Sequence, residues 1–294
     1  MLTGALVVWF AEAAVAAVLV AADIGHTPES PVLKWGFVIV TVYTGPIGLV
    51  LYLWSCRQPL PGTHEAYVQA RWRQVVGSTM HCVAGDGIGI LAAAAVTAPL
   101  GLPAWADILV EYAAGFAFGW TIFQALFMKD MAGGSYRRSL TMTFLPEFVS
   151  MNGLMAAMAA VSIPFRQAVG GTSGPGDPGF WFVYCVALSA GFAVSYPLNW
   201  WLVAAGLKHG MMTVRPGGRP VPLAGGLALA GAALVSSSGH AESHHRAAHA
   251  GDETARTGEG ASKVQVKAAM VAVSLAVLGL GLVVAGVAGS LLVR

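Results

Sequence analysis

Residues 80–89 of this 294-residue chain place a thioether, an imidazole, a thiol and a carboxylate in one apolar segment. The side chains concerned are Met80, His81, Cys82 and Asp86. An ionisable group in hydrocarbon costs at least about 2.5–3.5 kcal/mol, so such groups persist mainly where they face a bundle interior or a water path. We interpret the segment as one wall of a functional site, which needs partners from elsewhere in the chain.

Helical geometry separates the donors within this segment. Cys82 and Asp86 are four residues apart and share one face of a helix. His81 and Cys82 are neighbours, so they diverge by about a quarter turn or more, and a single ion could take both only if the adjacent glycines unwind the backbone. We interpret two pairs of glycines as small-residue faces for close helix packing: Gly85, Gly89, Gly115 and Gly119.

Two further apolar segments carry polar side chains that could complete the site. Glu111 lies about one and a half turns inside its predicted span, deep enough to need a partner. The next segment contains Pro146, followed by Glu147, Met151 and Asn152. A proline removes a backbone donor and frees a carbonyl in the preceding turn, which can open a helix to an ion.

The combined ligand set is mixed in hardness, with carboxylates, thiol, thioether, amide and imidazole. Such a set suits a transition-metal ion such as copper, iron or zinc. The predicted metal site contains His81, Cys82, Asp86, Glu111, Glu147, Met151 and Asn152. The competing interpretation is that methionines only fill gaps in a core. It explains Met155 and Met158, but it leaves the polar groups of three adjacent spans in need of partners.

Composition places the chain among membrane proteins. Hydrophobic residues make up 56% and charged residues 10% of it, whereas soluble domains carry about a quarter charged residues. The net charge is only +2, and nothing suggests a nucleic-acid partner. The three cysteines are odd in number and scattered, which favours free thiols over a disulfide framework. We expect a multi-pass protein of the plasma membrane, with the lipid bilayer as a partner.

The hydrophobic pattern predicts an all-α fold, a polytopic transmembrane helix bundle of about eight spans. A helix of roughly 17–25 apolar residues can cross a bilayer, and the windows of this kind are 4–22, 32–54, 76–98, 105–128, 140–163, 179–205, 220–236 and 268–292. The seventh is the weakest because Pro220 and Pro222 crowd its start, so a seven-span or re-entrant version stays open. The predicted divisions are a bundle at 1–235, a flexible loop at 236–263 and a final helix at 264–294.

Lysine and arginine are retained on the cytoplasmic side of a membrane protein. With eight spans, 10 of the 16 basic residues follow the even-numbered spans or end the chain, and so share one side. This count predicts that both termini are cytoplasmic and that the loop at 236–263 is extracytoplasmic.

The loop is small, polar and without pattern, which is typical of a disordered linker. It contains His240, His244, His245 and His249, which could chelate a metal as an accessory site if the segment became helical. The simpler interpretation is a solvated linker that happens to contain histidines.

Several motifs together resemble the bacterial membrane family catalogued as domain of unknown function 4396. They are His81-Cys82 with Gly85-Asp86, the Glu-Tyr-x-x-Gly-x-x-x-Gly stretch at 111–119, Phe-Met-Lys-Asp at 127–130, Pro146-Glu147 with Met151-Asn152-Gly153, and Tyr196-Pro197-x-Asn199-Trp200-Trp201. The resemblance covers about residues 30–215. It implies a membrane architecture and supports the choice of site residues, and it assigns no reaction.

We expect the protein to bind and translocate a transition-metal cation between its third, fourth and fifth spans, with proton coupling. Glu111 or Glu147 would exchange protons with the ion, and the loop histidines would collect it. The chain has no Walker loop and no nucleophile elbow, which disfavours hydrolytic or ATP-driven chemistry.

Two other classes stay open. The first is a non-transporting membrane subunit that scaffolds or assembles a metal or redox complex, alone or as a homo-oligomer. The second is a membrane redox enzyme. Because His81 is the only histidine well inside a predicted span, a bis-histidine haem does not fit, but a His81–Met151 pair does.

Overall fold

The computed structural model describes residues 2–126, 128–129, 133–168, 174–211, 213–214, 220–221 and 252–292. Within them the regular secondary structure is helical apart from one pair of two-residue strands. The α-helices are α1 (Leu2–Asp23), α2 (Pro31–Thr44), α3 (Pro46–Ser55), α4 (His64–Tyr67), α5 (Arg71–Thr97), α6 (Ala104–Phe118), α7 (Tyr136–Ala168), α8 (Pro178–Ala204) and α9 (Asp252–Leu292). The short elements are the 3₁₀ turns η1 (Ile24–His26) and η2 (Ala98–Leu100), the π-helical segment η3 (Gly119–Leu126), and the antiparallel strands β1 (Thr213–Val214) and β2 (Pro220–Val221).

Among the described residues, six helices are long and apolar enough to cross a membrane: α1, α5, α6 continued by η3, α7, α8 and α9. Each is at least 23 residues long with its short extensions, and about 20 residues span the hydrocarbon core. The all-α prediction is confirmed, and the protein is a helical membrane protein.

The predicted second span, 32–54, is wrong as a crossing, because the structure forms a helical hairpin there. Helices α2 and α3 have 14 and 10 residues, or about 21 and 15 Å at 1.5 Å per residue, which is too short for a core of about 30 Å. The chain turns between them at Gly45, whose φ of +57° suits glycine, and Pro46 then starts α3.

The base and tip of this hairpin show that it enters and leaves at one end of the bundle. At the tip, a Cβ on Gly45 would lie 3.5 Å from the Cβ of Ala13, which is halfway along α1. At the base, Arg57 Nε lies 2.7 Å from Asp23 Oδ2 at the end of α1. The α2–α3 hairpin is therefore re-entrant, which a membrane tolerates where the turn is covered by protein.

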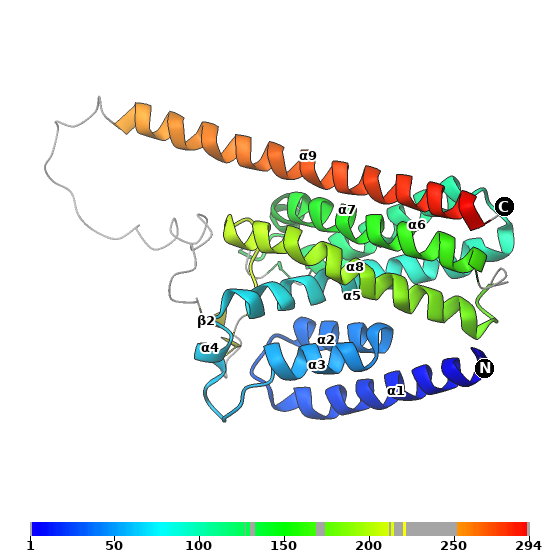
Figure 1. The fold of residues 1–294 in the computed structure, drawn as a ribbon. Helices are drawn as coiled ribbons and strands as arrows, with labels where there is room; N and C mark the ends of the chain where they lie inside the picture. Colours follow the sequence, from blue (N-terminus) through cyan, green and yellow to red (C-terminus); the bar gives the residue numbers. More distant parts are fainter. Residues whose placement is uncertain are drawn as a thin grey trace, which may run out of the picture.

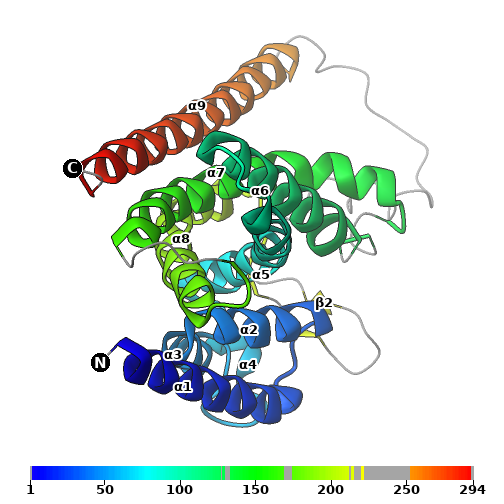
Figure 2. The same ribbon diagram turned by 90° about the vertical axis from the view of Figure 1, so that its right-hand side faces the viewer.

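The remaining helices pack around α5 and α7 (Figures 1 and 2), which have the most buried spans. Helix α6 lies against α5, α8 against α5 and α7, and α9 along α7. Asn152 bonds Ser274, and Gly281 packs on Ala156, so α7 and α9 run in the same direction. Helices α1 and α9 lie on opposite sides of the bundle, and their spans are mostly exposed.

The two ends of the chain lie at the same end of the bundle (Figure 1). The helix ends and connections at the opposite end carry most of the described basic residues: Lys34, Arg57, Arg71, Arg73, Lys129, Arg137 and Arg138. Because the hairpin adds no crossing, the chain reaches Arg57 after one crossing instead of two. The eight-span count that placed both termini on the basic, cytoplasmic side therefore loses its basis.

Two predicted segments fall largely outside the described residues. Of the seventh window, only Pro220 and Val221 are described, and they form β2. The loop predicted at 236–263 lies outside as far as residue 251, together with its four histidines. From Asp252 the chain is helical, so the final helix begins earlier than predicted. Residues 252–263 include Ala, Glu, Arg and Lys, which are good helix formers.

Candidate functional site

Cys82 of α5 lies at the centre of a buried group of polar side chains. Its thiol donates to Glu147 Oε2 on α7 at 2.9 Å. Its sulfur also accepts from Gln124 Nε2 on η3 at 3.0 Å and from Lys208 Nζ at 2.6 Å. We refer to this group as the Cys82 cluster, and its members are Cys82, Asp86, Gln124, Glu147, Asn199 and Lys208, none more than 9% exposed.

Asp86 and Glu147 bring two carboxyl groups together beside Gly119. Both are fully buried. A Cβ on Gly119 would overlap Asp86 Oδ1 and lie 2.6 Å from Glu147 Oε1. Both Asp86 oxygens and Glu147 Oε1 accept no hydrogen bond from a donor in the described part of the chain. The pair therefore has oxygen atoms directed at each other that need a proton or a cation between them.

Lys208 enters the cluster because the chain reverses after α8. Gly206 adopts a φ of +66°, its N–H bonds the carbonyl of Val203, and the Leu207 N–H bonds that of Leu202. This is the Schellman arrangement that ends a helix. It turns Lys208 back along the bundle, where Nζ reaches Cys82 and also Asn199 Oδ1 at 2.7 Å.

Asn199 joins the cluster to the α7–α8 interface. Its amide donates to Ser150 Oγ and to the Ser195 carbonyl, both at 3.0 Å. Just outside the spans, desolvation and then the charge of Lys208 lower the pKa of His209 to about 4. His209 is therefore neutral near pH 7 and adds no second positive charge beside Lys208.

The structure brings together three of the seven residues predicted to bind metal, namely Cys82, Asp86 and Glu147. Met151 lies close by, since its Cε is 2.9 Å from the position of a Cβ on Gly115. His81, although next to Cys82, places its ring edge-on to Phe123 with centroids 5.7 Å apart.

The other two predicted ligands bond neighbouring helices. Glu111 accepts a hydrogen bond from the Tyr184 hydroxyl on α8. Asn152 accepts from the Tyr112 hydroxyl at 2.8 Å and donates to Ser274 on α9 at 3.0 Å. Both side chains thus bond groups that do not belong to the Cys82 cluster, and these bonds link neighbouring helices.

Three members of the cluster were missed by sequence reasoning: Gln124, Asn199 and Lys208. In the sequence, Lys208 is a basic residue that flanks a span, as many lysines do. The glycine two positions earlier is the one signal that the chain can turn back. Gln124 lies in η3, and π-helical turns often occur at functional sites. The hydrophobic pattern of the sequence does not predict where such turns form.

Helices α5 and α6 approach closely at the four glycines predicted for packing. A Cβ on Gly89 would lie 2.7 Å from the Cα of Gly115, and one on Gly85 would lie 2.7 Å from the Cβ of Phe123. This close approach is what lets η3 place Gln124 against Cys82.

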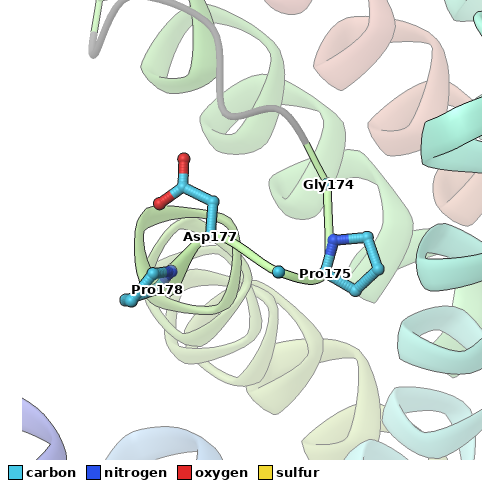
Figure 3. Close-up of a pocket in the computed structure, with 5 residues that line it drawn as sticks. Gly174, Pro175, Asp177 and Pro178 are labelled. Carbon is cyan, nitrogen blue, oxygen red and sulfur yellow. The ribbon is translucent and has the colours of Figure 1, made fainter.

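An open hollow near the start of α8 offers less chemistry (Figure 3). It is lined by Gly174, Pro175, Gly176, Asp177 and Pro178. The one ionisable side chain among them, Asp177, accepts the Gly179 N–H at 2.8 Å and so caps α8. The carboxylate of Asp177 therefore serves as the N-cap of α8.

Residues 71–208 match the model of a family described as "Domain of unknown function (DUF4396)". The segment that matches this family model, which we call the DUF4396 domain, covers less than half of the chain. The resemblance predicted over about 30–215 is thus confirmed for the part from the start of α5 to Lys208. All six residues of the Cys82 cluster lie within the DUF4396 domain, whereas α1 to α4 and α9 lie outside it. No curated protein and no solved structure matches the chain.

Proposed function

We propose that the protein is a proton-coupled carrier of a transition-metal cation, with Cys82, Asp86 and Glu147 as the ion site. The observation that supports this most is the pair of buried carboxyl groups beside Gly119, one of which, Glu147, also accepts the Cys82 thiol. An ion would draw the three groups closer, because their ligand atoms do not all lie within 4.8 Å of one another. Thiolate and carboxylate together favour a borderline-soft cation over magnesium or calcium.

The carboxyl pair supplies the coupling. Two buried carboxylates side by side repel each other, so the pair holds a proton unless a cation takes its place. A cation arriving at Asp86 and Glu147 displaces that proton, and a proton returning releases the cation. The same oxygens cannot serve both at once, which makes the two fluxes opposite in direction.

Lys208 keeps the site neutralised when no cation is bound. Its ammonium group lies 2.6 Å from the Cys82 sulfur, where it would compete with a metal ion for that ligand. Lys208 stands on the segment after α8 and not within a helix, so it can withdraw without unwinding a span. We infer that cation binding displaces Lys208 and that its return helps release the ion.

The test is uptake by the purified protein in liposomes, with zinc, copper(I), iron(II) or manganese outside and a pH gradient imposed. Asp86→Asn and Glu147→Gln should each lower cation-dependent proton movement at least about tenfold, a loss of about 1.4 kcal/mol in transition-state stabilisation. Glu12→Gln is the matched control, because Glu12 is exposed on α1.

A non-transporting subunit is the second candidate, and the helix ties made by Glu111 and Asn152 favour it. In that case wild type and both variants would show the same leak-level flux with every cation. Such a result would overturn the carrier proposal and leave the Cys82 cluster with a structural role.

A further inference from the structure

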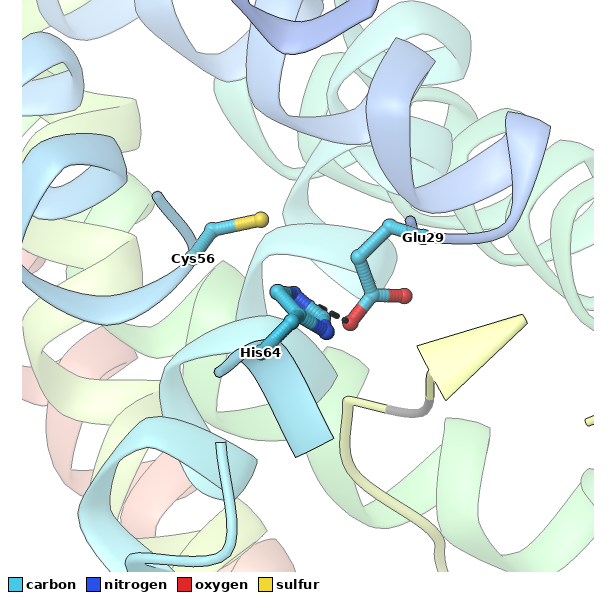
Figure 4. A group of neighbouring side chains, drawn as sticks. All are labelled: Glu29, Cys56 and His64. Atoms are coloured by element: carbon cyan, nitrogen blue, oxygen red, sulfur yellow. Dashed lines mark ion pairs between the residues drawn. The ribbon is translucent and has the colours of Figure 1, made fainter. Parts of the chain in front are cut away.

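A second group of buried side chains lies at the base of the α2–α3 hairpin, outside the DUF4396 domain. It contains Glu29, Cys56 and His64 (Figure 4). Glu29 precedes α2, Cys56 follows α3, and His64 is the first residue of α4. Their exposed fractions are 4%, 0% and 1%, so three segments each bury one metal-ligating side chain at the same point.

The ligand atoms of these three groups lie at a spacing that one ion could bridge. One ligand atom from each residue lies within 4.8 Å of the other two, and in the described part of the chain no other three His, Cys, Asp or Glu side chains do so. His64 Nε2 and Glu29 Oε1 are 3.7 Å apart, beyond hydrogen-bond length. Ligands on a tetrahedral zinc ion, with bonds of about 2.0–2.3 Å, are about 3.3–3.7 Å apart.

Neighbouring groups hold each ligand in place. The His64 ring bonds the backbone of Cys56, which leaves Nε2 directed at Glu29. The backbone N–H of His64 donates to Gln58 Oε1 at 3.0 Å. Glu29 Oε2 accepts the backbone N–H of Ser30 at 3.2 Å, and the other oxygen of Glu29, Oε1, faces the imidazole. Outer bonds of this kind orient the ligands of natural metal sites.

Charge at this point is compatible with a cation. Among the described residues, the positive charge of Lys34 acts on both Cys56 and His64. Its ammonium group is bonded to the Gly25 carbonyl at 3.2 Å in an exposed position, where water screens it.

We propose that Glu29, Cys56 and His64 form a resident site for a zinc-like divalent ion, with a water molecule as fourth ligand. Such an ion would fasten the linker before α2, the end of α3 and the start of α4 to one another. It would thereby fix the base of the re-entrant hairpin, a role separate from transport through the Cys82 cluster.

The experiment measures zinc in the full-length protein purified in detergent after exposure to zinc and extensive dialysis. Wild type should retain about one zinc per chain, as a three-ligand site with water does. Cys56→Ser and His64→Ala should each lose most of it. Cys185→Ser is the control, since Cys185 lies on α8 away from the hairpin base, and it should keep the ion.

Cobalt(II) binding tests the site in the wild-type protein, so this measurement does not depend on whether a variant folds. Wild type loaded with cobalt should show a thiolate-to-cobalt charge-transfer band, and zinc should abolish it. Absence of that band in folded wild type, or equal zinc retention by wild type and Cys56→Ser, would overturn the proposal. Asp86→Asn and Glu147→Gln should retain the zinc, so this result is independent of the transport assay.

Discussion

Gly119 leaves room for the contact between Asp86 and Glu147. Any side chain there would occupy the space that the two carboxyl oxygens share. The glycine was predicted as a helix-packing residue, and the structure adds that it borders the acidic pair. At this position, helix packing and the contact between the two carboxyl groups both require a residue without a side chain.

Replacing Gly119 with alanine should therefore harm both stability and transport. Overpacking a core costs about 1–3 kcal/mol, and the added Cβ would separate the carboxyl groups. We expect a lower melting temperature in detergent and a loss of cation-coupled proton flux.

Gly279→Ala is the control for this change. A Cβ on Gly279 meets nothing within 4 Å, so alanine there should be neutral or slightly stabilising because it favours the helix. Equal melting temperatures and equal transport rates for Gly119→Ala and Gly279→Ala would contradict the inference that Asp86 and Glu147 meet beside Gly119.

Because the α2–α3 hairpin adds no crossing, it changes the direction of the later helices relative to α1. Its tip lies against the middle of α1 and its base against the end of α1. Tyr52 near the end of α3 donates to Asp23 Oδ2 at 2.6 Å, which ties the returning helix to the point where α1 ended. The hairpin is thus held at both its tip and its base.

Cysteine labelling can decide between a hairpin and a crossing helix. His26 and Leu60 flank the hairpin and are exposed. In a background without native cysteines, His26→Cys and Leu60→Cys should both react with an impermeant thiol reagent from the same side of sealed vesicles. Reaction from opposite sides would show that residues 32–54 cross the membrane after all.

The bundle as a whole has one basic end and one end that carries the chain termini. At the terminal end, the described basic side chain is Arg166, which pairs with Asp107 at 3.5 Å. Because basic segments are retained in the cytoplasm, we expect the termini of the folded bundle to lie on the outer side. The same rule gave the opposite answer when residues 32–54 were counted as a crossing.

Reporter fusions test this orientation. A reporter that works only outside the cytoplasm should be active when fused to either terminus, and it should be inactive when inserted after Lys129, in the connection between η3 and α7. Activity of the inserted reporter together with silent terminal fusions would restore the cytoplasmic placement of both ends.

The sequence by itself determined the class of the protein and part of its site. Apolar windows long enough to cross a bilayer required helices. The cost of burying ionisable groups indicated seven candidate residues, of which Cys82, Asp86 and Glu147 lie together in the structure. The all-α class is confirmed because it depends on composition and local spacing, which any fold of this chain must respect.

Only the tertiary structure decided which polar groups meet. Lys208 joins Cys82 across 126 residues of chain, and Cys56 meets Glu29 because the chain turns at Gly45. Average hydropathy over residues 32–54 is the same for a crossing helix and for two helices joined by a turn. The difference arises from one positive φ and from contacts with α1, and such long-range contacts leave no periodic pattern in the sequence.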